Sequence, residues 1–204
     1  MKNYIVINNQ QIELTEEQVK LILEANNAGK TRLAEVPAGE GIKIGGYELL
    51  ILEQMGESTA LICKDLMGED SGFGENNNYD SSYVDDICDS FAEALEVEIG
   101  EDSIVPHVVD LTSDDGLKDY GKIERRVSLI TADQYRRYVE ILDKFKPDRW
   151  WWLATPHSTQ KHNNASWIKC VSPSGFIRYD DCYGGSGVRP FCIFNSSIFE
   201  SLDG

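Results

Sequence analysis

The longest apolar runs of this chain are only five or six residues long, which limits the fold more than any other feature. Tyr47–Leu52 is interrupted by Glu48, and Trp150–Ala154 is followed directly by Thr-Pro. A membrane-spanning helix needs about 20 predominantly apolar residues, so we expect neither run to cross a bilayer. Short apolar runs bounded by Gly, Asn, Asp and Pro are typical of buried strands.

Two segments have the period of amphipathic helices. Ser81 or Ser82 is a good N-cap for a helix over Tyr83–Leu95, whose apolar residues recur at helical spacing. Thr131 and Gln134 have the spacing of a capping box and predict a helix over Ala132–Phe145. Helices between clusters of short strands indicate the α+β class.

The remaining apolar segments predict strands separated by long polar loops. The expected strands of the C-terminal half are Trp150–Ala154, Ala165–Val171, Phe176–Tyr179 and Val188–Phe194. Gly68–Asp80 and Asp110–Glu124 are rich in Gly, Asn and Asp, and we expect them to be irregular loops.

The N-terminal residues predict a small ββα unit. Tyr4–Ile7 and Gln11–Leu14 are expected strands around an Asn8-Asn9 turn, and Thr15 begins a helix that ends near Asn26–Gly29. We therefore divide the chain into a small unit over residues 1–34 and a main domain over residues 35–204.

The charge of the chain narrows the choice of partner. The sequence has 19 Lys and Arg against 35 Asp and Glu, a net charge of −16. Such a surface repels nucleic acid and anionic lipid but attracts a basic protein surface, including one that normally holds nucleic acid. The N-terminus has no apolar signal region, so we expect a cytoplasmic protein.

The cysteines and histidines do not predict a catalytic or metal centre. The five cysteines are odd in number and lack C-x-x-C spacing, which favours reduced thiols. A zinc site formed by His157 and His162 with Cys170 or Cys182 is an open alternative, although no paired-ligand spacing supports it. We predict no catalytic residue, no metal site and no cofactor.

Two short motifs carry a resemblance to a known family. Trp151-Trp152-Leu153-Ala154-Thr155-Pro156 is followed after a strand–turn–strand segment by Gly187-Val188-Arg189-Pro190. This arrangement resembles an uncharacterised family of Gram-positive bacteria and their phages that carries W-W-L-x-[ST]-P and G-V-R-P. The resemblance covers roughly residues 41–194. It implies a C-type-lectin-like or formylglycine-generating-enzyme-like fold, with a twisted antiparallel sheet, two helices and long loops.

The resemblance does not extend to an activity. Formylglycine-generating enzymes use a cysteine pair near the end of the fold, but the surroundings of Cys182 and Cys192 do not match that active site. Buried tryptophan and arginine side chains fit a structural role, which we assign to Trp151, Trp152, Arg189 and Pro190. We predict a binding face on the loops, formed by His157, Trp167, Arg178, Tyr179 and Tyr183.

Two functions remain open on this basis. The first is a non-enzymatic protein-binding protein of a phage or prophage, whose acidic surface inhibits a basic host protein such as a nucleic-acid-handling defence enzyme, in the manner of anti-CRISPR proteins. The second is a ligand- or glycan-recognition module of a phage or bacterial surface structure, in which the aromatic side chains of the loop face contact the ligand.

Overall fold

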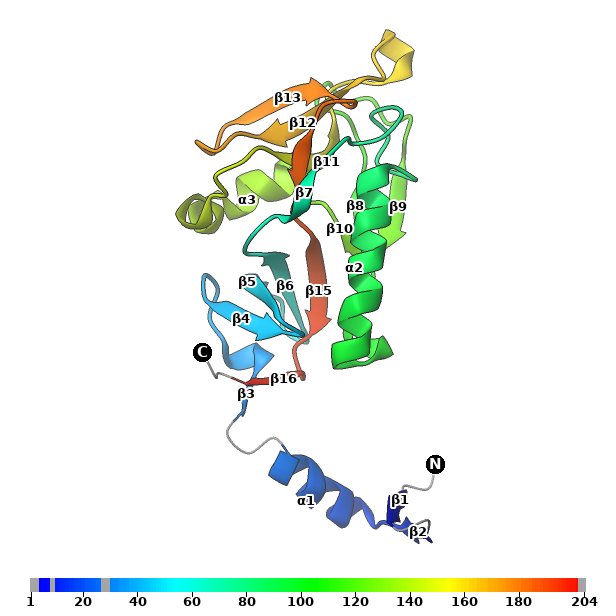
Figure 1. The fold of residues 1–204 in the computed structure, drawn as a ribbon, viewed down its shortest axis with the longest axis vertical. Coiled ribbons are helices and arrows are strands. Elements are labelled where there is room, and N and C mark those ends of the chain that lie inside the picture. The colour runs from blue at the N-terminus through cyan, green and yellow to red at the C-terminus, as the bar shows by residue number, and fades with distance from the viewer. Residues whose placement is uncertain (1–3, 8–9, 27–29, 202–204) are drawn as a thin grey trace.

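The computed structural model describes residues 4–7, 10–26 and 30–201 (Figure 1). The described residues form an α+β fold of mostly antiparallel sheets, as the sequence predicts. They contain three α-helices: α1 (Glu16–Asn26), α2 (Tyr83–Ile99) and α3 (Ala132–Leu142). None of these helices is long and apolar enough to span a membrane.

Two five-stranded sheets form the body of the fold. The first has the strand order β10 (Val127–Ser128), β15 (Phe191–Asn195), β6 (Ser58–Cys63), β5 (Tyr47–Gln54) and β4 (Gly41–Ile44). The second has the order β13 (Ile177–Asp181), β12 (Trp167–Val171), β11 (Trp151–Pro156), β14 (Ser186–Val188) and β7 (Met67–Ser71). All their pairings are antiparallel except that of β11 with β14.

Three strand pairs complete the described structure. They are β1 (Tyr4–Ile7) with β2 (Gln10–Glu13), β3 (Lys30–Arg32) with β16 (Phe199–Ser201), and β8 (His107–Asp110) with β9 (Lys122–Arg125). Leu33, directly after β3, is fully buried in the main core. The predicted Asn8-Asn9 turn and the helix end at residues 27–29 lie outside the described residues, and the division at residue 34 remains a prediction.

The chain passes directly from one large sheet to the other, with no helix or other strand between, at two places. Residues 64–66 connect β6 to β7, and Arg189-Pro190 connects β14 to β15. The sequence predicted one strand over Val188–Phe194, which is wrong because the chain changes sheets at Arg189-Pro190. Alternating apolar residues indicate a strand but carry no sign of which sheet each part joins.

Arg189 ties the two crossings together. Its Nε donates to Cys63 O at 2.8 Å, and its Nη2 donates to Lys64 O at 2.9 Å and Phe145 O at 3.0 Å. The guanidinium also lies over the Trp151 ring, 5.3 Å from its centroid. Burial lowers the pKa of Arg189 to about 10, so the side chain stays charged at neutral pH.

The core consists of two apolar clusters, to which neighbouring residues of β11 contribute. Trp152 belongs to the cluster beneath α2, and Trp151 to the one beneath α3. Successive strand residues face opposite sides of a sheet, so the adjacent tryptophans each fill one cluster. The indole Nε1 of Trp152 donates to Ser71 O at 2.8 Å.

Both loops predicted as irregular contain strands, so those predictions are wrong in part. All of β7 except Met67 lies in the first predicted loop, and all of β9 except Arg125 lies in the second. Three of the five β7 residues are exposed at a sheet edge, and β8–β9 is a separate two-stranded hairpin. Strands with few buried side chains lack the apolar alternation on which the prediction depends. In addition, α2 continues to Ile99, and α3 ends at Leu142 before a 3₁₀ turn over Asp143–Phe145.

His107, at the start of β8, should make stability depend on pH. Its Nε2 lies 2.8 Å from Ser128 Oγ, its ring packs edge-to-face on Phe191, and burial lowers the pKa of His107 to about 4. The unfolded chain takes up this proton near pH 6.5, so acid stabilises the unfolded state. We expect His107 to account for a loss of about 2 kcal/mol between pH 7 and pH 5. Urea unfolding of wild type and His107→Gln at both pH values measures this difference, and equal losses in the two proteins would contradict it.

Candidate functional site

An exposed aromatic cluster lies on β12, β13 and the loop after β11. The rings of His157 and Tyr179 are stacked, with centroids 4.4 Å apart and planes at 16°. Trp167 meets Tyr179 edge-to-face at 5.2 Å and 83°. Trp167 is 40% exposed and Tyr179 51% exposed. The structure thus brings three of the five predicted binding residues into contact, and each keeps access to solvent.

A charged group supports this cluster from below. Lys169, opposite Tyr179 on β12, places its Nζ 5.8 Å from the Tyr179 ring centroid and 2.8 Å from Asp114 Oδ2. Burial raises the pKa of Asp114, but the hydrogen bond from Lys169 and the charges of Lys169 and Arg136 outweigh it, so the pKa is lowered overall. His157 Nδ1 is 3.9 Å from the same carboxylate oxygen, beyond hydrogen-bonding distance. Asp114 therefore stays ionised and holds Lys169 beneath the rings.

Asn77 fixes the loop that carries His157. This residue is fully buried, and its Nδ2 donates to Trp167 O at 2.7 Å and to Ser158 O at 2.9 Å. Its Oδ1 accepts a hydrogen bond from Tyr120 at 2.8 Å, and its backbone N–H donates to Ala165 O. One amide side chain therefore joins both ends of the loop to the β8–β9 hairpin loop.

Asp115 provides a second tether between the same loops. Its Oδ2 accepts from Ser158 Oγ at 2.7 Å and lies 2.9 Å from His162 Nδ1, while its Oδ1 accepts from Ser113 Oγ. Hydrogen bonds from Ser113 and Ser158 are the main reasons why the pKa of Asp115 is well below its usual range. Serine and histidine both bond to the carboxylate, so these contacts join loops and do not align the histidine as a base toward the serine.

The other two predicted binding residues lie beside the cluster but do not join it. Arg178 neighbours Tyr179 on β13 but occupies the other face, where its guanidinium lies 5.3 Å from the Phe176 ring centroid. Tyr183 follows β13, is 71% exposed and donates its hydroxyl to Glu75 O. Exposed Trp150, directly before β11, adds a further aromatic to the same sheet.

The residues assigned a structural role lie in the interior. Trp151, Trp152 and Arg189 are at most 1% exposed. The carbonyl of Pro190 accepts from Cys63 N at 2.8 Å, which joins the two crossings a second time.

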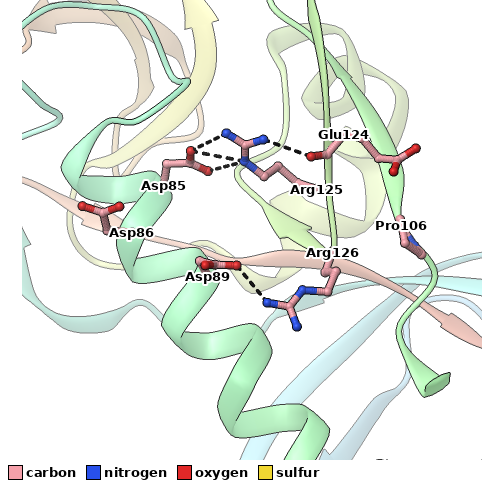
Figure 2. Close-up of a pocket in the computed structure, with 7 residues that line it drawn as sticks. All are labelled: Asp85, Asp86, Asp89, Pro106, Glu124, Arg125 and Arg126. Atoms are coloured by element: carbon pink, nitrogen blue, oxygen red, sulfur yellow. Dashed lines mark hydrogen bonds and ion pairs between the residues drawn. The ribbon is translucent and has the colours of Figure 1, made fainter. Parts of the chain in front are cut away.

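A separate pocket of about 350 Å³ lies between α2 and β9 (Figure 2). Asp85, Asp86 and Asp89 of α2 line one side, and Arg125 and Arg126 line the other. Figure 2 shows the arginines pointing toward the helix carboxylates.

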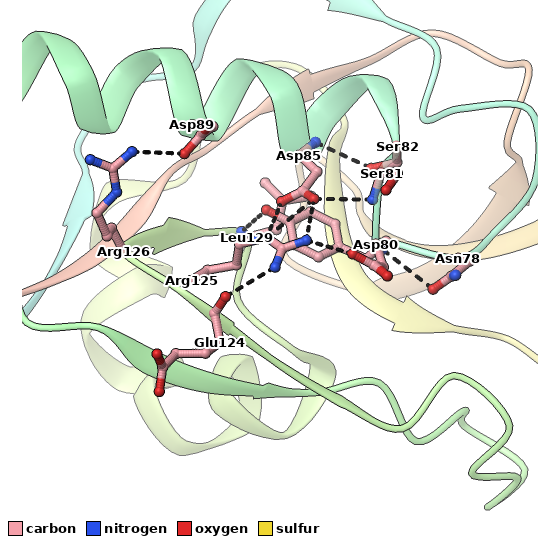
Figure 3. Close-up of polar contacts among 11 residues, drawn as sticks. Asn78, Asp80, Ser81, Ser82, Asp85, Asp89, Glu124, Arg125, Arg126 and Leu129 are labelled. Carbon is pink, nitrogen blue, oxygen red and sulfur yellow. Dashed lines mark hydrogen bonds and ion pairs between the residues drawn. The ribbon is translucent and has the colours of Figure 1, made fainter.

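Ion pairs within this pocket attach the β8–β9 hairpin to α2. Arg125 contacts both carboxylate oxygens of Asp85 and reaches Asp80, and Arg126 contacts Asp89 (Figures 2 and 3). Arg126 also donates to Glu96. The hydrogen bond to Asp85 is the main cause of the raised pKa of Arg125. Both guanidinium groups are already neutralised, so the pocket serves to hold the hairpin rather than to offer a free cation.

The five cysteines are free and buried. Burial raises the pKa of Cys88 and of Cys170 to about 12, and it also raises the pKa of Cys182 and Cys192. These thiols are therefore protonated at neutral pH and poorly nucleophilic. Among the residues that the structure describes, no three His, Cys, Asp or Glu side chains are grouped to hold a metal ion.

The residues that support the aromatic cluster could not be found from the sequence. Asn77, Asp114, Asp115 and Lys169 lie far apart along the chain and meet only through loop packing. Asn77 occurs within Asn76-Asn77-Asn78, where turn formation explains all three residues equally well.

Comparison with known proteins identifies no relative of the chain. No protein-family model matches it, and no curated protein or solved structure is significantly similar to it.

Proposed function

We propose that this chain is a non-enzymatic protein-binding protein with a C-type-lectin-like main domain, encoded by a phage or prophage and acting in the cytoplasm of its bacterial host. The observation that carries the proposal is the cluster of solvent-accessible rings on one face of β12 and β13, formed by His157, Trp167 and Tyr179. Tyrosine, tryptophan and phenylalanine are enriched at protein interfaces and supply most of their energetic anchors.

The polar network beneath this surface supports the same proposal. Asn77 and Asp115 hold the loop of His157 and Ser158 through buried and partly buried hydrogen bonds. A loop that is ordered before binding loses less conformational entropy when the partner arrives. This kind of support suits a surface that recognises a partner of fixed shape.

The acidic helix α2 suggests the chemistry of the partner. Its 17 residues include no Lys, Arg or His and contain six carboxylates: Asp85, Asp86, Asp89, Glu93, Glu96 and Glu98. Within the described structure, exposed Asp86, Glu93 and Glu98 form no ion pair. Unpaired charge accelerates association with a surface of opposite charge. We infer a basic host protein, such as a nucleic-acid-handling defence enzyme whose channel the acidic chain occupies, as anti-CRISPR proteins do.

Replacing Trp167 with alanine should weaken partner binding about 30-fold without unfolding the chain. An aromatic anchor typically contributes about 2 kcal/mol or more to an interface, and Trp167 is only partly buried in the free protein. The test first isolates the partner from host lysate and then measures its affinity for each variant by surface plasmon resonance. Val108→Ala, an exposed apolar residue of β8, is the matched control. Equal affinities for wild type and Trp167→Ala would contradict the assigned surface.

A separate experiment tests the contribution of the exposed α2 carboxylates to partner binding. Asp86→Asn, Glu93→Gln and Glu98→Gln combined should slow association at low salt and change the dissociation rate little. If host lysate yields no basic protein even at low salt, the inhibitor proposal is wrong.

A second candidate function is glycan recognition. The observation that favours it is the flat stack of His157 and Tyr179 with the partly exposed Trp167 beside it, since exposed rings can pack against the apolar face of a sugar. Binding on a glycan array that Trp167→Ala abolishes would support this function, and an array without any signal would exclude it for the glycans displayed.

A further inference from the structure

The outer edge of β13 has the features of a self-pairing surface. β13 is the terminal strand of the second sheet, and among the described residues only β12 pairs with it (Figure 1). Arg178, Tyr179 and Asp180 at its centre are all exposed. An open strand edge presents backbone donors and acceptors to another chain.

The hydrogen bonds between β12 and β13 show which backbone N–H and C=O groups of β13 face the open edge. Cys182 N donates to Ser166 O, and Ser172 N donates to Phe176 O, on either side of this ladder. In an antiparallel pair, alternate residues of a strand bond to the same neighbour. The even-numbered residues of β13 therefore bond to β12, and the backbone groups of the odd-numbered residues point to the open edge.

Tyr179 is the central outward-facing residue of the strand. The outermost outward donor, Asp181 N, is covered by the Asp180 carboxylate at 2.8 Å. No such side chain covers the backbone N–H of Tyr179 or Ile177 in the described structure. A second strand centred on Tyr179 would thus meet free donors and acceptors.

The side chains on either side of Tyr179 are complementary to a second copy of the same strand. If two β13 strands pair antiparallel about a two-fold axis at Tyr179, Arg178 of each copy lies directly opposite Asp180 of the other. These are non-hydrogen-bonded positions, where opposing side chains approach most closely. The two-fold axis therefore creates two equivalent Arg–Asp pairs from a single pair of residues.

We propose that the chain forms a homodimer by antiparallel pairing of β13 with β13 of a second copy, with Tyr179 on the two-fold axis. The sheet that contains β13 in one copy then continues into the same sheet of the other copy across the interface. Pairing places Tyr179 of each copy opposite its equivalent, so the two aromatic clusters become neighbours on one face. This inference does not depend on the identity of any other partner.

Charge exchange at two positions tests the dimer. Sedimentation velocity from about 1 μM to about 1 mM, near physiological salt, should show wild type shifting from one chain to two. In the Arg178→Asp variant, the new carboxylate of each copy faces Asp180 of the other copy. In the Asp180→Arg variant, the new guanidinium of each copy faces Arg178 of the other copy. Each single variant should weaken dimerisation about tenfold or more, and the double variant Arg178→Asp/Asp180→Arg should restore it because the pairs are re-formed with reversed polarity.

Both substituted positions are exposed, and circular dichroism establishes that each variant is folded. Loss of the dimer in both single variants and its recovery in the double variant would support the β13 interface. A wild type that remains a single chain at the highest concentration would overturn the proposal, as would a dimer that neither single variant weakens.

Discussion

Asn77→Asp should destabilise the protein by about 4 kcal/mol at neutral pH. The substitution replaces an amide that donates to Ser158 O and Trp167 O with a carboxylate of almost the same size. The Ser158 carbonyl loses its donor, the Trp167 carbonyl keeps only the N–H of His157, and a charge is placed against both carbonyls without a cation. Since the shape of the side chain hardly changes, the loss reports hydrogen bonding and charge rather than packing.

Chemical denaturation at several pH values measures this effect. The introduced carboxyl has a raised folded-state pKa, so the deficit should shrink as the pH falls and the group becomes neutral. The matched control is Asn76→Asp, because Asn76 is exposed and its Oδ1 only accepts from Asn78 N, which a carboxylate can also do. That variant should stay within about 0.5 kcal/mol of wild type. Similar losses of stability in Asn77→Asp and Asn76→Asp would contradict the role of the Asn77 hydrogen bonds in holding the loop.

Arg189→Met should cost about 3 kcal/mol of folding free energy. Methionine fills much of the arginine volume but cannot donate to Cys63 O, Lys64 O or Phe145 O. Removing a buried charge offsets part of the loss, because no carboxylate among the described residues pairs with this guanidinium. The three unsatisfied carbonyls outweigh that gain.

The same denaturation experiment measures how much Arg189 contributes to stability. Arg137→Met is the control, since the Arg137 side chain is 61% exposed, pairs with Glu53 at the surface and lies over the Tyr138 ring. Surface pairs of this kind contribute about 1 kcal/mol or less. A stability for Arg189→Met equal to that of the control would mean that the two sheet crossings do not need the arginine.

The sequence was sufficient to predict the elements with strong periodicity or a clear cap. The α2 helix begins at the predicted residue because Ser82 accepts from Asp85 N, and α3 begins where the Thr131–Gln134 capping box forms. These signals are local, so neighbouring residues determine them.

Elements that depend on distant residues could not be predicted in this way. β7 and β9 have polar sequences, and they become strands because β14 and β8 lie beside them. The exchange of sheets at Arg189 likewise depends on carbonyls of residues 63, 64 and 145. The same holds for the candidate site. Its exposed aromatic residues could be named from the sequence, whereas Asn77 could not be distinguished from Asn76 and Asn78.

The most direct test of the proposed recognition surface is oxidative footprinting of the chain with and without its isolated protein partner. Trp167 and Tyr179 are exposed in the free protein and should be protected in the complex, while Tyr4 of β1, 57% exposed, should react equally in both. Protection confined to other residues, with Trp167 and Tyr179 oxidised at the free rate, would contradict the assignment of this sheet as the binding face.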